Sequence, residues 1–157
     1  MKCSTNRTKG YTLIELMVVV GIISLLLGLS LNGLYNLIQW SKLNTAAALL
    51  SSELKDAQSR AFYEGVSYKI DFWEPLDRYR VYKQKEGYYE VYKDIQLEDI
   101  DLFNTNFTND RVNFNPNGSP SMGGTVTLKN KRGKILYVIM TPVTARVRVS
   151  PDPPENW

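Results

Sequence analysis

The chain has 157 residues, of which 43% are hydrophobic and 22% charged, and its formal net charge is +3. It has no histidine, and its single cysteine is Cys3. These counts exclude a Ser-His-Asp or Cys-His catalytic centre, an HExxH zinc site, a CxxC redox pair and a disulfide within the chain. The length and composition fit one folded domain, with or without an appended segment.

The N-terminus changes abruptly from polar to apolar. Residues 1–10 carry three basic side chains and no acidic one, and residues 11–31 form an apolar segment whose only charge is Glu15. As a helix, residues 11–31 would span roughly 31 Å, which is about the thickness of the hydrocarbon core of a bilayer. We therefore expect residues 11–31 to be transmembrane, with the basic flank on the cytoplasmic side.

Three interpretations of this segment compete. A secretory signal needs a small-residue cleavage site directly after the apolar stretch, but the nearest candidate, residues 46–48, lies about fifteen residues beyond it. A plain membrane anchor leaves Glu15 unexplained, because a carboxylate at membrane depth costs on the order of 3 kcal/mol. The third interpretation accounts for the whole pattern: Lys9-Gly10-Tyr11-Thr12-Leu13-Ile14-Glu15 resembles the leader junction of type IV prepilins and type II secretion pseudopilins.

This resemblance implies a specific processing event. Prepilin peptidase would remove residues 1–10 by cleaving after Gly10, and would methylate the new amine of Tyr11, where the family usually has Phe. The glutamate at the fifth position of the mature chain in this family corresponds to Glu15. Cleavage would lower the formal net charge from +3 to zero and would remove Cys3, so the mature chain would have no cysteine.

Glu15 would lie in the first turn of a helix, where the macrodipole favours a negative charge. The cationic amine of Tyr11 in a neighbouring subunit would neutralise it there. Because pairing offsets the cost of burying a charge only when the partner is well placed, Glu15 would set the register of subunit packing. Two alternatives stay open: Glu15 reaches the lipid headgroups, or it pairs with the amine of its own chain.

The helix is expected to continue beyond the membrane. A single apolar stripe recurs at spacings of three and four residues, and Gly65 supplies the stop. The stripe consists of Leu43, Ala47, Leu50, Leu54, Ala57 and Ala61. We therefore predict one helix over 11–64, membrane-spanning in its first half and amphipathic in its second, with a possible local kink at Asn32-Gly33.

Downstream of Gly65 the hydrophobic period falls to two, which is typical of strands. We expect strands at 66–72, 78–83, 88–93, 111–115, 125–129, 134–140 and 143–149, while 96–110 is ambiguous. Short strands joined by short turns predict an antiparallel β-sheet or sandwich over residues 65–150, followed by a frayed tail over 151–157. The fold class is therefore α+β, with the long N-terminal helix packed on the β domain.

The β region carries a second, looser resemblance. Its residues 112–118, 123–128, 135–140 and 144–149 are similar to the C-terminal domain of GspH/FimT-type minor pilins. That family usually has Gly where Ala145 stands. The resemblance implies a low-copy subunit.

Charge is segregated along the β region. Residues 65–110 hold six basic and ten acidic side chains, whereas residues 111–149 hold seven basic and no acidic ones. Lys131 and Arg132 are expected at a hairpin tip, and Arg146 and Arg148 on one face of a strand. Some FimT-type proteins bind DNA during uptake through basic C-terminal residues, so the resemblance permits these four as DNA-binding candidates. The alternatives are electrostatic contacts between subunits, against the acidic segment, and simple solubility.

The sequence therefore predicts a minor type IV pilin or type II secretion pseudopilin, not an enzyme, with no cofactor or metal site. Its expected partners are prepilin peptidase, other pilin or pseudopilin subunits and, before assembly, the lipid bilayer. We expect a single-pass protein of the bacterial inner membrane, with the leader in the cytoplasm and the β domain outside, that later joins a periplasmic or extracellular fibre. A DNA-binding minor pilin at a pilus tip is the alternative.

Overall fold

The structure, a computed structural model, describes residues 11–142 and 145–154. It divides into two compact units, Met1–Leu37 and Ile38–Trp157, and the division lies within the single long helix. The second half of that helix therefore forms one unit with the strands.

Helix α1 spans Leu13–Glu64, 52 residues, and is continuous through Asn32 and Gly33. In the first unit, the described side chains of α1 are exposed on every side of the helix. Within the described residues, α1 is the one helix whose length and apolar composition are sufficient to cross a membrane, and none of its most apolar window is buried in the protein.

The second half of α1 is amphipathic, as the sequence predicts. All six side chains of the predicted stripe are at most 1% exposed, and Leu50 and its neighbours form part of the hydrophobic core. The helix ends where Gly65 adopts a φ of +66°, with its N–H donating to the carbonyl of Ala61 at 3.1 Å. This left-handed conformation at the helix C-terminus is the one that glycine adopts most readily.

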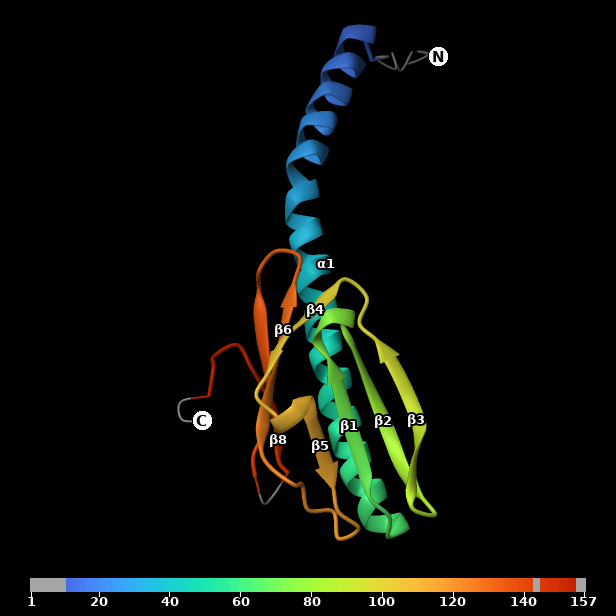
Figure 1. Cartoon of the computed structure of the whole chain (residues 1–157). Coiled ribbons are helices and arrows are strands. Elements are labelled where there is room, and N and C mark those ends of the chain that lie inside the picture. Colours follow the sequence, from blue (N-terminus) through green and yellow to red (C-terminus); the bar gives the residue numbers. More distant parts are fainter. Residues whose placement is uncertain (1–10, 143–144, 155–157) are drawn as a thin grey trace, which may run out of the picture. The chain divides into compact units, whose positions relative to one another are not determined.

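Within residues 11–142 and 145–154, eight strands form two antiparallel sheets of four (Figure 1). The first sheet has the order β3-β2-β1-β5, and the second has the order β4-β6-β7-β8. The strands are β1 (Tyr68–Trp73), β2 (Arg78–Lys85), β3 (Tyr88–Gln96), β4 (Ile100–Thr105), β5 (Arg111–Phe114), β6 (Gly124–Asn130), β7 (Ile135–Met140) and β8 (Val147–Ser150). The predicted α+β class with an antiparallel β region is confirmed.

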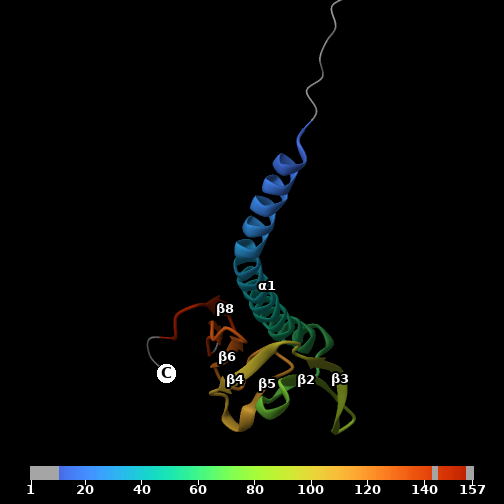
Figure 2. The same cartoon turned by 90° about the horizontal axis from the view of Figure 1, so that it is seen from above.

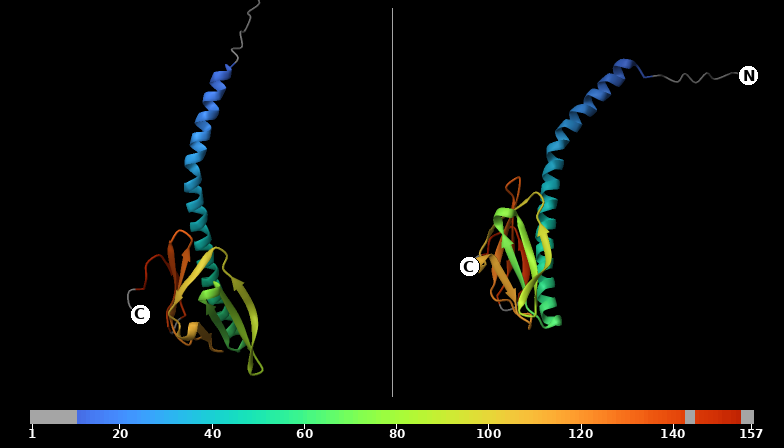
Figure 3. Two further views of the ribbon diagram at one scale, coloured as in Figure 1. Left: turned by 45° about the horizontal axis from the view of Figure 1, so that its top comes forward. Right: turned by 45° about the vertical axis from the view of Figure 1, so that its right-hand side comes forward.

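The connections explain why the two sheets share one core. Strands β1, β2 and β3 form a meander, and the ambiguous segment 96–110 contains β4 and a short 3₁₀ turn, Thr108–Asp110. The chain then returns to the first sheet as β5, which pairs with β1, before β6, β7 and β8 form a second meander. Figures 2 and 3 show both sheets beside the C-terminal half of α1, whose stripe joins their inner faces in a single hydrophobic cluster.

The last strand is shorter than the sequence predicts. Strand β8 begins at Val147, whereas the expected strand began at residue 143; residues 143–144 lie outside the described residues. Ala145 is buried with a φ of +50°, which interrupts extended structure before β8. Because an L-residue is strained in this left-handed region, glycine is the favoured residue there, as in the resembling family.

Candidate functional site

The predicted processing junction lies directly before a capped helix start. The Glu15 N–H donates to Thr12 Oγ1 at 3.3 Å, and the Leu16 N–H donates to the Thr12 carbonyl at 3.2 Å. Thr12 is therefore the N-cap, and Thr-x-x-Glu is a sequence pattern typical of capping boxes. Tyr11 precedes the helix and is 86% exposed, while Gly10 lies outside the described residues.

Glu15 occupies the first helical turn, as expected from the sequence, and its side chain is exposed. It borders a shallow hollow together with Tyr11, Leu16 and Val19. Tyr11 and Glu15 thus lie on the same side of the helix start. The positive end of the helix dipole favours both the carboxylate and any further anion at this place.

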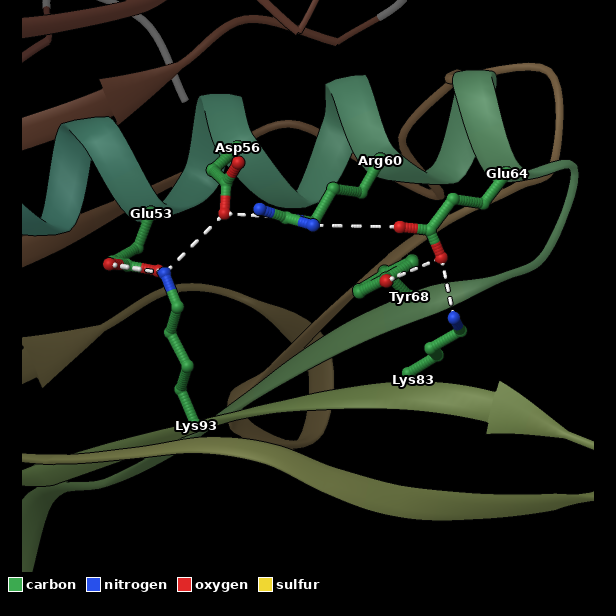
Figure 4. Close-up of polar contacts among 7 residues, drawn as sticks. All are labelled: Glu53, Asp56, Arg60, Glu64, Tyr68, Lys83 and Lys93. Atoms are coloured by element: carbon green, nitrogen blue, oxygen red, sulfur yellow. Dashed lines mark hydrogen bonds and ion pairs between the residues drawn. The ribbon is translucent and has the colours of Figure 1, made fainter.

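A second polar group, which the sequence analysis missed, fixes the C-terminal half of α1 on the first sheet (Figure 4). Lys93 of β3 lies 2.7 Å from Glu53 and 3.4 Å from Asp56. Further along the helix, Glu64 accepts from Lys83 of β2 at 2.6 Å and from the Tyr68 hydroxyl of β1 at 3.0 Å. The signal in the sequence for this polar group was a series of acidic side chains along the helix, Glu53, Asp56 and Glu64, which are spaced three and eight residues apart.

Arg60 completes this group by pairing with Asp56 at 2.9 Å and with Glu64 at 3.5 Å. The hydrogen bond from Lys83 holds the pKa of Glu64 below its ordinary value, and the hydrogen bond to Glu53 raises the pKa of Lys93. Burial, together with the bond to Glu64, raises the pKa of Tyr68. These shifts favour the carboxylate of Glu64, the ammonium of Lys93 and the neutral hydroxyl of Tyr68, which are the forms that make the bonds between the helix and the sheet.

The charge segregation of the sequence is partly neutralised inside the fold. Arg111 pairs with Asp71 through two bonds, of 2.5 and 3.0 Å, which join the basic segment to the acidic one. Lys131, a DNA-binding candidate, pairs with Asp99, which also accepts from Lys42 at 2.5 Å. These pairs lie within one chain, so electrostatic contact between subunits stays a prediction.

The four basic candidates fall into two separate pairs. Lys131 and Arg132 lie in the turn between β6 and β7, before the first residue of β7. Arg148 pairs in register with Ile139, near the other end of β7. At about 3.3 Å per residue, the four residue steps from Ile135, at the start of β7, to Ile139 span roughly 13 Å.

Arg146 and Arg148 are exposed and flank the buried Val147, so they point to the same side. Arg146 precedes β8, and only Arg148 lies within that strand. The structure places Arg146 and Arg148 at the start of β8, near the opposite end of β7 from Lys131 and Arg132.

Comparison with protein families places a known motif at the processing junction. Residues 5–31 match the prokaryotic N-terminal methylation motif, which includes Gly10, Tyr11 and Glu15. Two kinds of solved structure share the fold of the rest. The minor pseudopilin EpsH from the type 2 secretion system of Vibrio cholerae aligns with a TM-score of 0.60 and 10% identity, over 69% of this chain and 96% of EpsH.

The second is the type IV minor pilin FimU of Pseudomonas aeruginosa. Its two crystal forms align with TM-scores of 0.56 and 0.58 at 13% identity, over 69% and 71% of this chain and 92% and 90% of FimU. This chain therefore shares its fold with EpsH and FimU. A comparison with curated protein sequences gives no match. The prepilin resemblance of the N-terminus is therefore supported by the methylation motif, and the resemblance of the β region is supported by the fold that this chain shares with EpsH and FimU.

Proposed function

We propose that this chain is a minor pilin or pseudopilin, a structural subunit without enzymatic activity. Prepilin peptidase cleaves it between Gly10 and Tyr11 and methylates the Tyr11 amine. The observation that carries this proposal is the match of residues 5–31 to the methylation motif, combined with a helix that starts at Leu13 behind an exposed Tyr11. The proposed scissile bond then precedes the first helical residue, Leu13, in the sequence.

Before assembly the apolar part of α1 lies in the bacterial inner membrane, with the leader in the cytoplasm and the β domain outside. After cleavage it leaves the bilayer and packs against the helices of other pilin subunits in a periplasmic or extracellular fibre. The exposed apolar side chains along 13–28 and 33–37 support this, because such a surface requires either lipid or other apolar helices. Van der Waals packing drives helix association where lipid is the competing environment.

Glu15 supplies the specific contact of this assembly. Its carboxylate pairs with the methylated amine of Tyr11 in a neighbouring subunit, and so sets the register in which the helices pack. The Thr12 cap supports this role, since it holds Glu15 in the first turn of the helix.

The test is to express the full precursor with prepilin peptidase and its pilus or secretion system, and to compare the wild type with Glu15→Ala. The variant should be cleaved normally but should fail to enter sheared fibres. Glu86→Ala, at the exposed turn between β2 and β3, is the matched control and should be incorporated. Normal incorporation of Glu15→Ala would refute the register role.

A second candidate function is DNA binding at a pilus tip during uptake. It is favoured by one observation, the exposure of Arg146 and Arg148 on the same side of the chain before and within β8. Lys131 is the weaker candidate because Asp99 already neutralises its charge. Arg132 lies beside Lys131 in the same turn between β6 and β7. DNA affinity should fall steeply with salt and be lost in an Arg146→Ala/Arg148→Ala double variant. Unchanged binding in that variant would dismiss this function.

A further inference from the structure

The first sheet has an outer face that carries cations interleaved with aromatic rings. On β1, Tyr68, Ile70 and Phe72 are buried in the core, so Lys69 and Trp73 point to the opposite side of the sheet. Cross-strand register places residues of β2, β3 and β5 on that same side. We call it the outer basic face: Lys69, Asp71, Trp73, Arg78, Arg80, Tyr82, Tyr89, Asp94 and Arg111.

The aromatic rings hold the cations of this face in place. The Lys69 ammonium lies 4.4 Å from the ring centroid of Tyr82 and 4.7 Å from that of Tyr89. The Arg80 and Arg78 guanidinium carbons lie 5.1 and 5.8 Å from the Trp73 ring. A guanidinium near a ring keeps N–H donors at its edge for a second partner.

The face has more positive than negative charge. Asp71 accepts from Arg111 and lies 3.4 Å from Lys69, and Asp94 lies 2.8 Å from Arg80 and 3.6 Å from Arg78. Four cations therefore share two carboxylates, which leaves an excess of two positive charges on this side of the sheet. This excess contrasts with the surrounding residues 65–110, whose acidic side chains outnumber the basic ones by four.

We propose that the outer basic face is a docking surface for an acidic protein surface. The charge excess selects an anionic partner, and Arg, Trp and Tyr are the residues that dominate the energetics of protein–protein interfaces. Because the rings and carboxylates already order the cations, little side-chain entropy is lost when the partner binds.

The positions of the two carboxylates on this face favour a protein partner over a nucleic acid. Asp71 and Asp94 lie among the cations, and a continuous line of phosphates would meet both of them. A protein partner places its carboxylates over the cations and avoids these two positions. This inference goes beyond the proposed subunit role and does not depend on cleavage, assembly or DNA binding by Arg146 and Arg148.

The experiment measures binding of two labelled probes to the full chain in detergent at low salt. One probe is a peptide of alternating Glu and Ser, about sixteen residues long, whose carboxylates lie roughly 7 Å apart when extended. The other is an oligo(dT) of equal charge. The peptide should bind, and Arg78→Gln/Arg80→Gln should weaken its binding about tenfold.

Two further variants keep the result interpretable. Asp94→Asn removes a competing carboxylate beside Arg78 and Arg80, so it should tighten peptide binding about threefold, a gain that misfolding does not produce. Arg146→Ala/Arg148→Ala, at the other basic surface, should leave peptide binding unchanged. Absence of peptide binding, loss of it in this second double variant, or tighter oligo(dT) binding through Arg78 and Arg80 would overturn the proposal.

Discussion

The ammonium of Lys93 on β3 lies 2.7 Å from Oε2 of Glu53 on α1, and so joins the helix to an edge strand of the first sheet. The Glu53 side chain is 13% exposed and that of Lys93 35%, so solvent screens this pair only partly. A double-mutant cycle of Glu53→Gln and Lys93→Met should give a coupling of about 1 kcal/mol in unfolding free energy.

The control for this cycle is the pair Lys85–Glu90 on β2 and β3, at 3.1 Å with both side chains 55% exposed. Its coupling should be at most about 0.3 kcal/mol, because exposed pairs contribute little. Equal couplings for the two pairs would mean that Lys93 does not anchor the helix. Both cycles are measured by denaturant unfolding of the full chain in detergent, followed by near-ultraviolet circular dichroism.

Adjacent leucines on α1 provide a matched test of the buried stripe. Leu50 is fully buried and Leu49 is 42% exposed. Leu50→Ala should cost about 2–5 kcal/mol of unfolding free energy, because it removes apolar contacts and leaves a cavity, whereas Leu49→Ala should change it by less than about 0.5 kcal/mol. Equal losses of unfolding free energy in the two variants would contradict the packing of the Leu50 face of the helix against the sheets.

Asp99 makes stability depend on pH. Hydrogen bonds from Lys131 and then Lys42 lower the pKa of Asp99 to about 2. Because this pKa is lower in the folded than in the unfolded chain, the stabilisation is present above about pH 4 and is lost as the pH falls to about 2. Asp99→Asn should therefore melt at a lower temperature than the wild type at pH 6, and the difference should vanish near pH 2. A difference that persists unchanged to pH 2 contradicts the ion pairs.

Thr12 should stabilise the first turn of α1. Thr12→Ala removes the acceptor for the Glu15 N–H and should cost about 1 kcal/mol, which corresponds to about fivefold faster exchange of the Glu15 amide hydrogen. Thr12→Ser keeps the acceptor and should retain the protection, and Thr45→Ala, at an exposed position in the helix, should leave it unchanged. The exchange is measured by NMR in detergent micelles, and equal protection in Thr12→Ala would exclude the cap.

The helix could be predicted because its signals are local. The stripe from Leu43 to Ala61 can be recognised from its spacing of three and four residues alone. The end of the helix at Gly65 can be recognised because glycine adopts a positive φ readily. The hairpin at Gly87 was predictable for the same reason, since a turn residue lies between two alternating segments. The start of the last strand was not predictable, because Ala145 adopts a left-handed conformation that an alanine side chain does not indicate.

The arrangement of the sheets depends on contacts between distant residues. The alternating polar and apolar residues of Arg111–Phe114 predict a strand, but they do not indicate that this strand, β5, pairs with β1 and not with a strand nearer in the chain. The pairing of Lys131 with Asp99 likewise follows from tertiary structure, so the sequence overstated the free positive charge of the basic segment. The processing junction was the most predictable part of the candidate site, because the Thr-Leu-Ile-Glu sequence and the apolar segment that follows are contiguous.

The central claim is that cleavage between Gly10 and Tyr11 produces the form of the chain that assembles. Intact-mass and N-terminal peptide mass spectrometry on the protein recovered from sheared fibres tests it most directly. The account predicts a chain that begins at N-methylated Tyr11 and therefore lacks Cys3. Fibre protein that still carries Met1, or that begins at any residue other than Tyr11, would contradict it.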